Sequence, residues 1–148
     1  MRPLLALLTL TLTLAVSCRD KSDDELIRDA VHRALTAVNE KKPGAVVEDA
    51  VADFKGPRSA NLQEVRRIIT GYLLTQGWVR AFERKLEVAV DGTTAHVDLE
   101  VVVTKGNKVE RLEDVIPTQA SVLDMDLDLE KREGKWRFTV GDYKVVPF

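Results

Sequence analysis

The apolar residues of this chain change their spacing near the middle of the sequence. Between about residue 22 and residue 77 they recur every three or four positions, the period of a helix with one buried side. Beyond Trp78 they alternate with charged residues, the period of a strand with one buried face. The order predicts an α+β fold, with helices first and an antiparallel sheet after them.

Capping residues and apolar spacing mark three helices in the first half. Ser22 and Glu25 have the spacing of a capping box, in which each residue binds the backbone N–H of the other, and Asn61 and Glu64 repeat it. The predicted helices cover about residues 23–41, 45–54 and 62–77. The third is expected to bury a stripe formed by Leu62, Val65, Ile68, Ile69, Tyr72 and Leu73.

Four alternating segments in the second half predict strands. They cover about residues 82–90, 95–103, 123–130 and 136–145. Asp91-Gly92 is a strong hairpin turn. The last strand changes phase by one residue, which a β-bulge at Gly141-Asp142 would absorb. Residues 108–118 are read either as an edge strand or as a long loop.

Two hairpin segments carry a resemblance to a known fold. The segments are DGTTAHV (residues 91–97) and EGKWRF (residues 133–138). With the long first helix they resemble the nuclear transport factor 2-like superfamily, which has the cystatin-like fold. The resemblance covers residues 22–146. It implies a cone in which three N-terminal helices pack on a curved antiparallel sheet of four or more strands, with room for a pocket.

The first 18 residues are a different kind of segment. An apolar run from Leu4 to Val16 follows Arg2, and it is shorter than the roughly 20 residues that span a bilayer. It therefore reads as a signal peptide, residues 1–17. The ending LAVSC places the only cysteine, Cys18, after small residues and resembles the lipobox of bacterial lipoproteins, although alanine stands where that motif prefers leucine.

The lipobox resemblance implies a membrane anchor. In that family the thiol, here Cys18, receives a diacylglycerol, the signal is cut before it, and the new amino terminus is usually acylated. Residues 18–21 would then be a short lipidated tether, and residues 22–148 a single domain. Arg19 in place of aspartate favours the outer membrane, facing the periplasm, by analogy with Gram-negative sorting. A lone cysteine also forms no internal disulfide.

Composition narrows the expected partners. The net charge of −2 is too close to neutral for nucleic acid as a partner. The sequence has no glycine-rich phosphate loop and no cysteine–histidine metal cluster, so we expect no cofactor and no metal. The acidic stripe of one strand is the expected partner-facing surface, and it consists of Asp124, Asp126, Asp128 and Glu130.

Candidate chemistry is sparse. His32 is expected at the edge of the first helix. His96 and Asp98 share a strand face, but their positions are roughly 7 Å apart, too far for a direct hydrogen bond. The acidic stripe fails as a calcium loop, because Leu129 and Lys135 stand where glycine and glutamate are required. We therefore expect no catalytic residue.

The interior of the cone offers the candidate ligand pocket. The candidate pocket residues are Tyr72, Met125, Trp136 and Phe138. An apolar cavity with one or two donors suits an apolar ligand, but the same side chains fill a core equally well. The expected function is a binding module for an envelope protein or a small apolar ligand.

Two alternatives follow from the resemblance. The superfamily includes isomerases, dehydratases and polyketide cyclases, so a pocket enzyme of that type is the alternative function. Its relatives also dimerise through the outer sheet face, which leaves a homodimer as one expected assembly. The charged stripe disfavours a large apolar interface there.

Overall fold

Capping boxes begin both long helices, as the sequence predicts. At the start of α1 (Asp23–Asn39) the Ser22 hydroxyl accepts a hydrogen bond from the Glu25 N–H at 3.2 Å, and the Glu25 carboxylate accepts one from the Ser22 N–H. Asn61 makes the same exchange at the start of α3 (Leu62–Thr75). Each box satisfies backbone N–H groups that have no partner within the helix.

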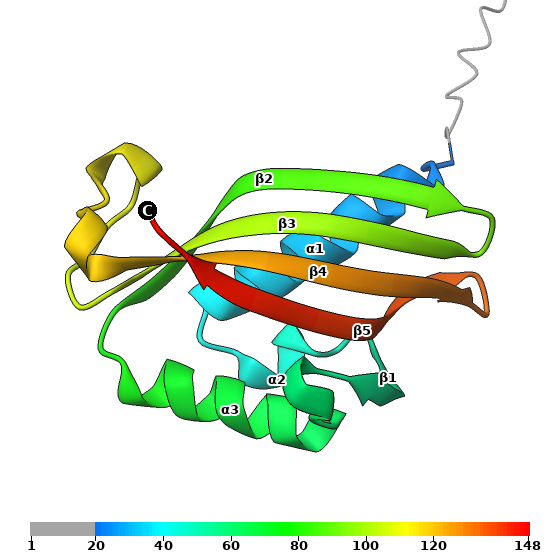
Figure 1. Ribbon diagram of the computed structural model, residues 1–148, viewed down its shortest axis with the longest axis horizontal. Helices are drawn as coiled ribbons and strands as arrows, with labels where there is room; N and C mark the ends of the chain where they lie inside the picture. The colour runs from blue at the N-terminus through cyan, green and yellow to red at the C-terminus, as the bar shows by residue number, and fades with distance from the viewer. Residues whose placement is uncertain (1–19) are drawn as a thin grey trace, which may run out of the picture.

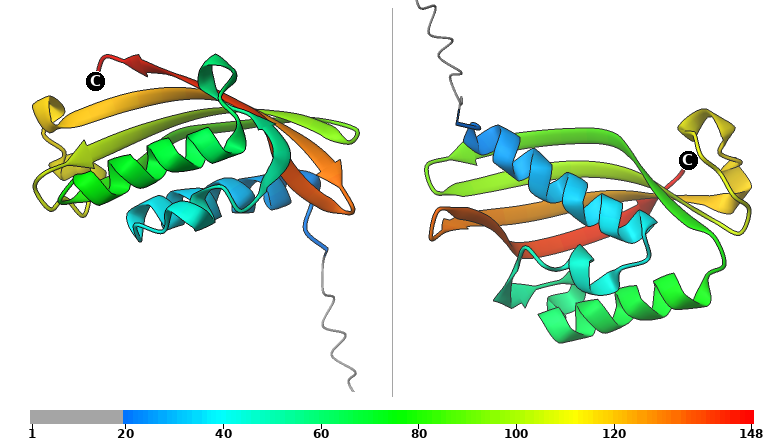
Figure 2. Two further views of the ribbon diagram at one scale, coloured as in Figure 1. Left: turned by 90° about the horizontal axis from the view of Figure 1, so that it is seen from below. Right: turned by 180° about the vertical axis from the view of Figure 1, so that it is seen from behind.

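The structure is a computed structural model that describes residues 20–148. Four long strands form most of the sheet: β2 (Val79–Asp91), β3 (Thr94–Lys105), β4 (Ala120–Arg132) and β5 (Lys135–Val146). The strand order is β1-β5-β4-β3-β2, with β1 parallel to β5 and the other pairs antiparallel. α1 and α3 lie on the same side of the sheet (Figures 1 and 2), and the opposite side is called the outer face below.

The second predicted helix is mostly wrong. Within residues 43–55 only α2 (Pro43–Val46) is helical, and β1 (Ala50–Lys55) is a strand. β1 completes the edge of β5, where the Asp49 carbonyl accepts a hydrogen bond from the Phe138 N–H at 2.9 Å. Apolar spacing over ten residues does not separate a helix from a buried strand, and the open edge of β5 decides between them.

A β-bulge in β2 changes which side chains face the helices. Arg84 is the extra residue. Glu83 therefore lies opposite Val101 on the helix side, while Phe82 lies opposite Val102 on the outer face. The bulge thus puts Phe82 and Leu86 on opposite faces, although their even spacing along the strand would place them on one face.

The phase change in β5 is also a bulge, but it lies earlier than predicted. Thr139 is the extra residue, because Val140 pairs with Asp128 and Phe138 pairs with Leu129. The bulge keeps Trp136, Phe138, Tyr143 and Val145 on the helix side, as expected. Gly141 is a regular strand position beneath the Phe54 ring.

The core lies between α1 and the helix side of the sheet. Its buried members are Ile27, Ala30, Val31, Ala81, Ala95, Val97, Leu99, Val101, Leu127, Leu129, Trp136 and Phe138. The alternating apolar residues of β3 and β4 are thus the ones that α1 covers. No helix within residues 20–148 is long and apolar enough to cross a membrane.

Residues 108–118 form a loop and not a strand. It contains two short turns, η2 (Leu112–Asp114) and η3 (Pro117–Gln119), and a third turn, η1 (Pro57–Ser59), precedes α3. The loop lies at the end of the sheet away from the start of α1 (Figure 1). The paired residues Val102 and Val122 are fully buried on the outer face.

Candidate functional site

None of the predicted pocket residues lines either of the two hollows described below. Trp136 and Phe138 are only 4% and 8% exposed and belong to the core, and Met125 is half-buried against it. Tyr72 is 39% exposed on α3 and lies outside that core, and its partial burial raises the pKa of its hydroxyl. Three of the four predicted pocket residues therefore pack together in or against the core, and Tyr72 lies apart from them.

The third helix explains the position of Tyr72. α3 packs against β1 and α2 rather than across the sheet. It therefore buries a narrow stripe, in which Leu73 is buried while Ile68 and Tyr72 are exposed. The wider stripe expected from the sequence would require the helix to cross the sheet, as α1 does.

The indole N–H of Trp136, one of the few polar groups among the candidate pocket residues, has a partner in the protein. Trp136 Nε1 donates to Asp23 Oδ1 at 2.9 Å, and Lys131 Nζ donates to the same oxygen at 2.7 Å. The hydrogen bond from Lys131, followed by that from Trp136, lowers the pKa of Asp23. This group ties the first turn of α1 to the β4–β5 hairpin, so its role is structural.

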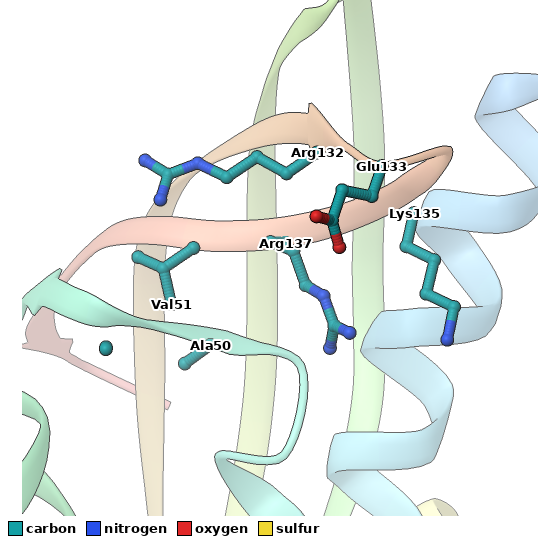
Figure 3. A pocket seen from close by; sticks show the side chains of 7 residues that line it. Ala50, Val51, Arg132, Glu133, Lys135 and Arg137 are labelled. Atoms are coloured by element: carbon teal, nitrogen blue, oxygen red, sulfur yellow. The ribbon is translucent and has the colours of Figure 1, made fainter.

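Two hollows in the described part of the chain are open to solvent, and charged side chains line both. The first is lined by Ala50, Val51, Ala52, Arg132, Glu133, Lys135 and Arg137. The basic side chains of Arg132, Lys135 and Arg137 spread apart there instead of meeting at one point (Figure 3). Arg137 is already paired with Asp49 at 3.3 Å and Arg132 with Asp53 at 3.2 Å. The hollow is therefore a weak candidate for an anion site.

The second hollow runs along α1 and α2 and contains His32. His32 Nε2 lies 2.8 Å from Glu83 Oε2, a contact that the bulge in β2 makes by turning Glu83 to the helix side. Sequence reasoning missed this pair because the bulge changes the strand alternation. Both side chains are at the surface, so they do not place an acid–base group inside the cone.

Three carboxylates lie side by side across the outer face. Asp98 of β3 is in register with Asp126 of β4, which is in register with Asp142 of β5. We call these three residues the acidic row. Like charges directly opposite each other destabilise a sheet, so this arrangement does not stabilise the fold.

The acids next to the row have cationic partners. Arg84 pairs with Glu100, and Lys144 lies 3.0 Å from Asp124. Among residues 20–148 no lysine or arginine makes an ion pair with the acidic row, and the side chain that does form ion pairs with it is a histidine. The row thus lacks the lysine or arginine ion pairs that Glu100 and Asp124 have.

That histidine is His96 of β3, whose side chain contacts one carboxylate on its own strand and two on β4. Its Nδ1 is 2.8 Å from Asp128 Oδ1, and its Nε2 is 3.5 Å from Asp98 Oδ1 and 3.9 Å from Asp126 Oδ1. The Asp128 hydrogen bond, followed by the charge of Asp98, raises the pKa of His96. The two strand positions of His96 and Asp98 are expected to be too far apart for a direct hydrogen bond, but the side chains lean toward each other and come within ion-pair distance.

Asp128 is the contact that sequence reasoning missed. His96 and Asp128 are 32 positions apart, and they meet because β3 and β4 pair in this register. The alternation in both segments places them on the charged face, but only the register makes them neighbours. Cys18 lies outside the described residues.

Comparison with known proteins supports the fold and not an activity. No family model and no curated protein matches the chain. An uncharacterised protein with a cystatin-like fold from Caulobacter vibrioides is similar in structure, with a TM-score of 0.66 at 17% identity over 83% of this chain and 89% of that one. A nuclear transport factor 2-like protein with a cystatin-like fold from Novosphingobium aromaticivorans gives 0.65 at 18% identity, over 84% and 82%.

A third similar structure bears the name of an enzyme. A putative scytalone dehydratase from Novosphingobium aromaticivorans gives a TM-score of 0.62 at 14% identity over 82% of each chain. Identities this low show the fold alone, so the chain has the cystatin-like, nuclear transport factor 2-like fold. This fold is shared by proteins with different roles and therefore does not decide the function.

Proposed function

We propose that this cystatin-like domain is a lipoprotein of the cell envelope that binds a protein partner through its outer sheet face. The anchor is the lipid on Cys18, and the domain is residues 22–148. The partner presents a basic surface to the acidic row. The proposal goes beyond the fold, and two features of the molecule support it.

The observation that carries the proposal is the unequal character of the two sheet faces. On the helix side, α1 and the strands fill the space where a ligand pocket was expected, and Trp136 and Phe138 are buried within that packing. On the outer face, the acidic row is exposed and has no lysine or arginine partner within residues 20–148. Complementary charge speeds association and selects the partner.

The anchor leaves this face accessible. α1 begins at Asp23, five positions after Cys18, and its start lies near the β2–β3 and β4–β5 hairpins (Figure 1). A lipid at Cys18 would hold this end of the domain close to the bilayer. The strands would then rise from the membrane with the outer face turned sideways, toward neighbouring envelope proteins.

Site-specific photo-crosslinking in intact cells tests this function. A photoreactive residue replaces Ala89 or Val140, two exposed outer-face positions in the same row as His96, or the exposed Leu74 of α3 as the control. We expect a defined crosslinked partner from the two outer-face positions and a weaker product, or none, from Leu74.

Charge reversal makes the result specific to the acidic row. Asp126→Lys with Asp142→Lys should abolish the crosslink, whereas Glu113→Lys, in the loop η2, should leave it unchanged. A crosslink that survives reversal of the row, or that forms only from α3, would contradict binding through the outer face.

Binding of a small apolar ligand is the second candidate function. Tyr143 and Val145 lie on the helix side of β5 but remain 48% and 64% exposed, because the helices do not cover that end of the strand. An apolar molecule could cover them. A dehydratase-like enzyme finds less support, since His32 lies at the surface and His96 on the outer face.

A further inference from the structure

One nitrogen and two oxygens converge at the edge of the acidic row. His96 Nε2 and one carboxylate oxygen each of Asp98 and Asp126 all lie within 4.8 Å of one another. The nitrogen is 3.5 Å from Asp98 Oδ1 and 3.9 Å from Asp126 Oδ1. A cation bound at about 2.1 Å in tetrahedral geometry keeps its ligand atoms about 3.4 Å apart. The three donors therefore nearly have the spacing of a metal site.

The imidazole is held in the orientation that a metal ligand needs. Asp128 Oδ1 lies 2.8 Å from His96 Nδ1 and accepts its proton in a hydrogen bond. This contact leaves Nε2 directed toward Asp98 and Asp126, so its lone pair coordinates once its own proton leaves. A carboxylate behind a histidine ligand commonly fixes the tautomer and the ring orientation at metal sites.

The surroundings favour a cation over further ion pairs. The acidic row places three like charges on three neighbouring strands, whereas Glu100 and Asp124 on the same face are paired with Arg84 and Lys144. All three proposed ligands stand on paired strands and not on a loop, so the backbone holds the donors in place. A divalent cation would remove the repulsion within the row.

We propose that His96, Asp98 and Asp126 bind a divalent first-row transition cation, with Asp128 as the positioning residue. One imidazole nitrogen with two carboxylate oxygens suits Zn²⁺ and its neighbours, whereas Ca²⁺ takes six to eight oxygen ligands. Water or a group of a bound partner completes the coordination. The site does not depend on partner binding, so either proposal can fail while the other stands.

Calorimetric titration with ZnCl₂ tests the site. The full-length chain is used with Cys18→Ser, which removes the thiol as a competing zinc ligand, in detergent after treatment with a chelator. We expect saturable binding of one Zn²⁺ per chain. His96→Gln, Asp98→Asn and Asp126→Asn should each abolish it, and Asp128→Asn should weaken it about tenfold because it only positions the ring.

Asp124→Asn is the matched control. Asp124 is on the same strand face, two positions from Asp126, but it is paired with Lys144. This variant should bind Zn²⁺ as the parent does. Absence of saturable binding, or equal weakening by Asp124→Asn and His96→Gln, would overturn the proposal, since the second result describes a diffuse effect of negative charge.

Nuclear magnetic resonance of the imidazole nitrogens provides a second readout. The chain has two histidines, and His32 contacts a single carboxylate, Glu83. Zn²⁺ should shift the Nε2 resonance of His96 and leave that of His32 in place. Equal shifts at both rings, or a shift at His32 alone, would exclude the assigned site even if heat is released in the titration.

Discussion

The side-chain amide of Asn39 pairs with the backbone of Ala81 as a neighbouring strand would. Asn39 Oδ1 accepts a hydrogen bond from the Ala81 N–H at 2.7 Å, and Asn39 Nδ2 donates to the Ala81 carbonyl at 3.1 Å. β2 is an edge strand, and Arg28 donates to the Leu86 carbonyl further along it. α1 therefore covers the core and also caps backbone groups that an edge strand leaves open.

Removing this amide should destabilise the fold. Asn39→Ala leaves the Ala81 N–H and carbonyl without their partner in a partly buried place, so we expect a loss of about 1–3 kcal/mol in the free energy of unfolding. Urea denaturation measures it. Asn107→Ala, which removes an exposed contact with Gln119, should change stability by less than about 0.5 kcal/mol. Equal effects would contradict a special role for Asn39.

The hydrogen bonds to Asp23 should make part of the free energy of unfolding sensitive to acid. The pKa of Asp23 is lowered in the folded state because Lys131 and Trp136 donate to its carboxylate. A lowered folded pKa contributes stability that is complete above the unfolded pKa and is lost as the pH falls through the folded pKa.

Asp23→Asn removes the charged carboxylate and with it this pH-dependent part of the stability. The difference in urea midpoint between parent and variant should be constant from pH 7 to about pH 5 and should shrink as the pH falls below about 4. Asp53→Asn, at an exposed carboxylate paired with Arg132, is the control and should show a smaller difference throughout. A difference for Asp23→Asn that does not change with pH would show that the carboxylate charge is not what matters.

Two glycines should respond to alanine in opposite directions. A Cβ at Gly141 would lie 3.0 Å from Phe54 Cζ and 3.3 Å from a Leu127 methyl, so Gly141→Ala should destabilise the domain by about 1–3 kcal/mol. Gly71 is inside α3 with open space around it, so Gly71→Ala should stabilise it by about 0.5–1 kcal/mol. Thermal unfolding of both variants measures this, and a neutral Gly141→Ala would contradict the close packing of β1 on β5.

The proposed membrane attachment depends on Cys18. Cys18→Ser should move the protein from the membrane fraction to the soluble fraction. Two or three acyl chains hold a protein to a bilayer stably, and the variant has no thiol to receive the diacylglycerol. Mass spectrometry of the N-terminal peptide should find acyl groups on the parent. Ser17→Thr, a neighbouring change that keeps the thiol, is the control. Tight membrane retention of Cys18→Ser would contradict lipidation at this residue.

The periodicity of the sequence predicts most of the fold, because each long element repeats its pattern several times. The capping boxes at Ser22 and Asn61 and the hairpin at Asp91 rest on local chemistry and are confirmed. β1 escapes prediction because its apolar residues also fit a helix, and only the edge of β5 decides between the two. The bulges at Arg84 and Thr139 depend on pairing between strands, which spacing alone does not show.

The outer-face site is predictable only in part. The alternation identifies Asp126 and Asp128 as one exposed stripe and His96 and Asp98 as another. Their contact arises from the register of β3 on β4, which is a long-range property. The pocket residues fail differently, since Tyr72 depends on the path of α3 and Trp136 on a partner, Asp23, more than 100 positions away.

Native mass spectrometry distinguishes a domain that binds a protein on its outer face and holds nothing in its interior from one that carries a ligand. The sample is the mature protein, extracted gently from the membranes of its source cells in detergent. We expect the acylated chain alone and in complex with a second polypeptide, with the complex absent in the Asp126→Lys, Asp142→Lys variant. An acylated chain that carries an apolar molecule of a few hundred daltons, and no polypeptide, would contradict this expectation.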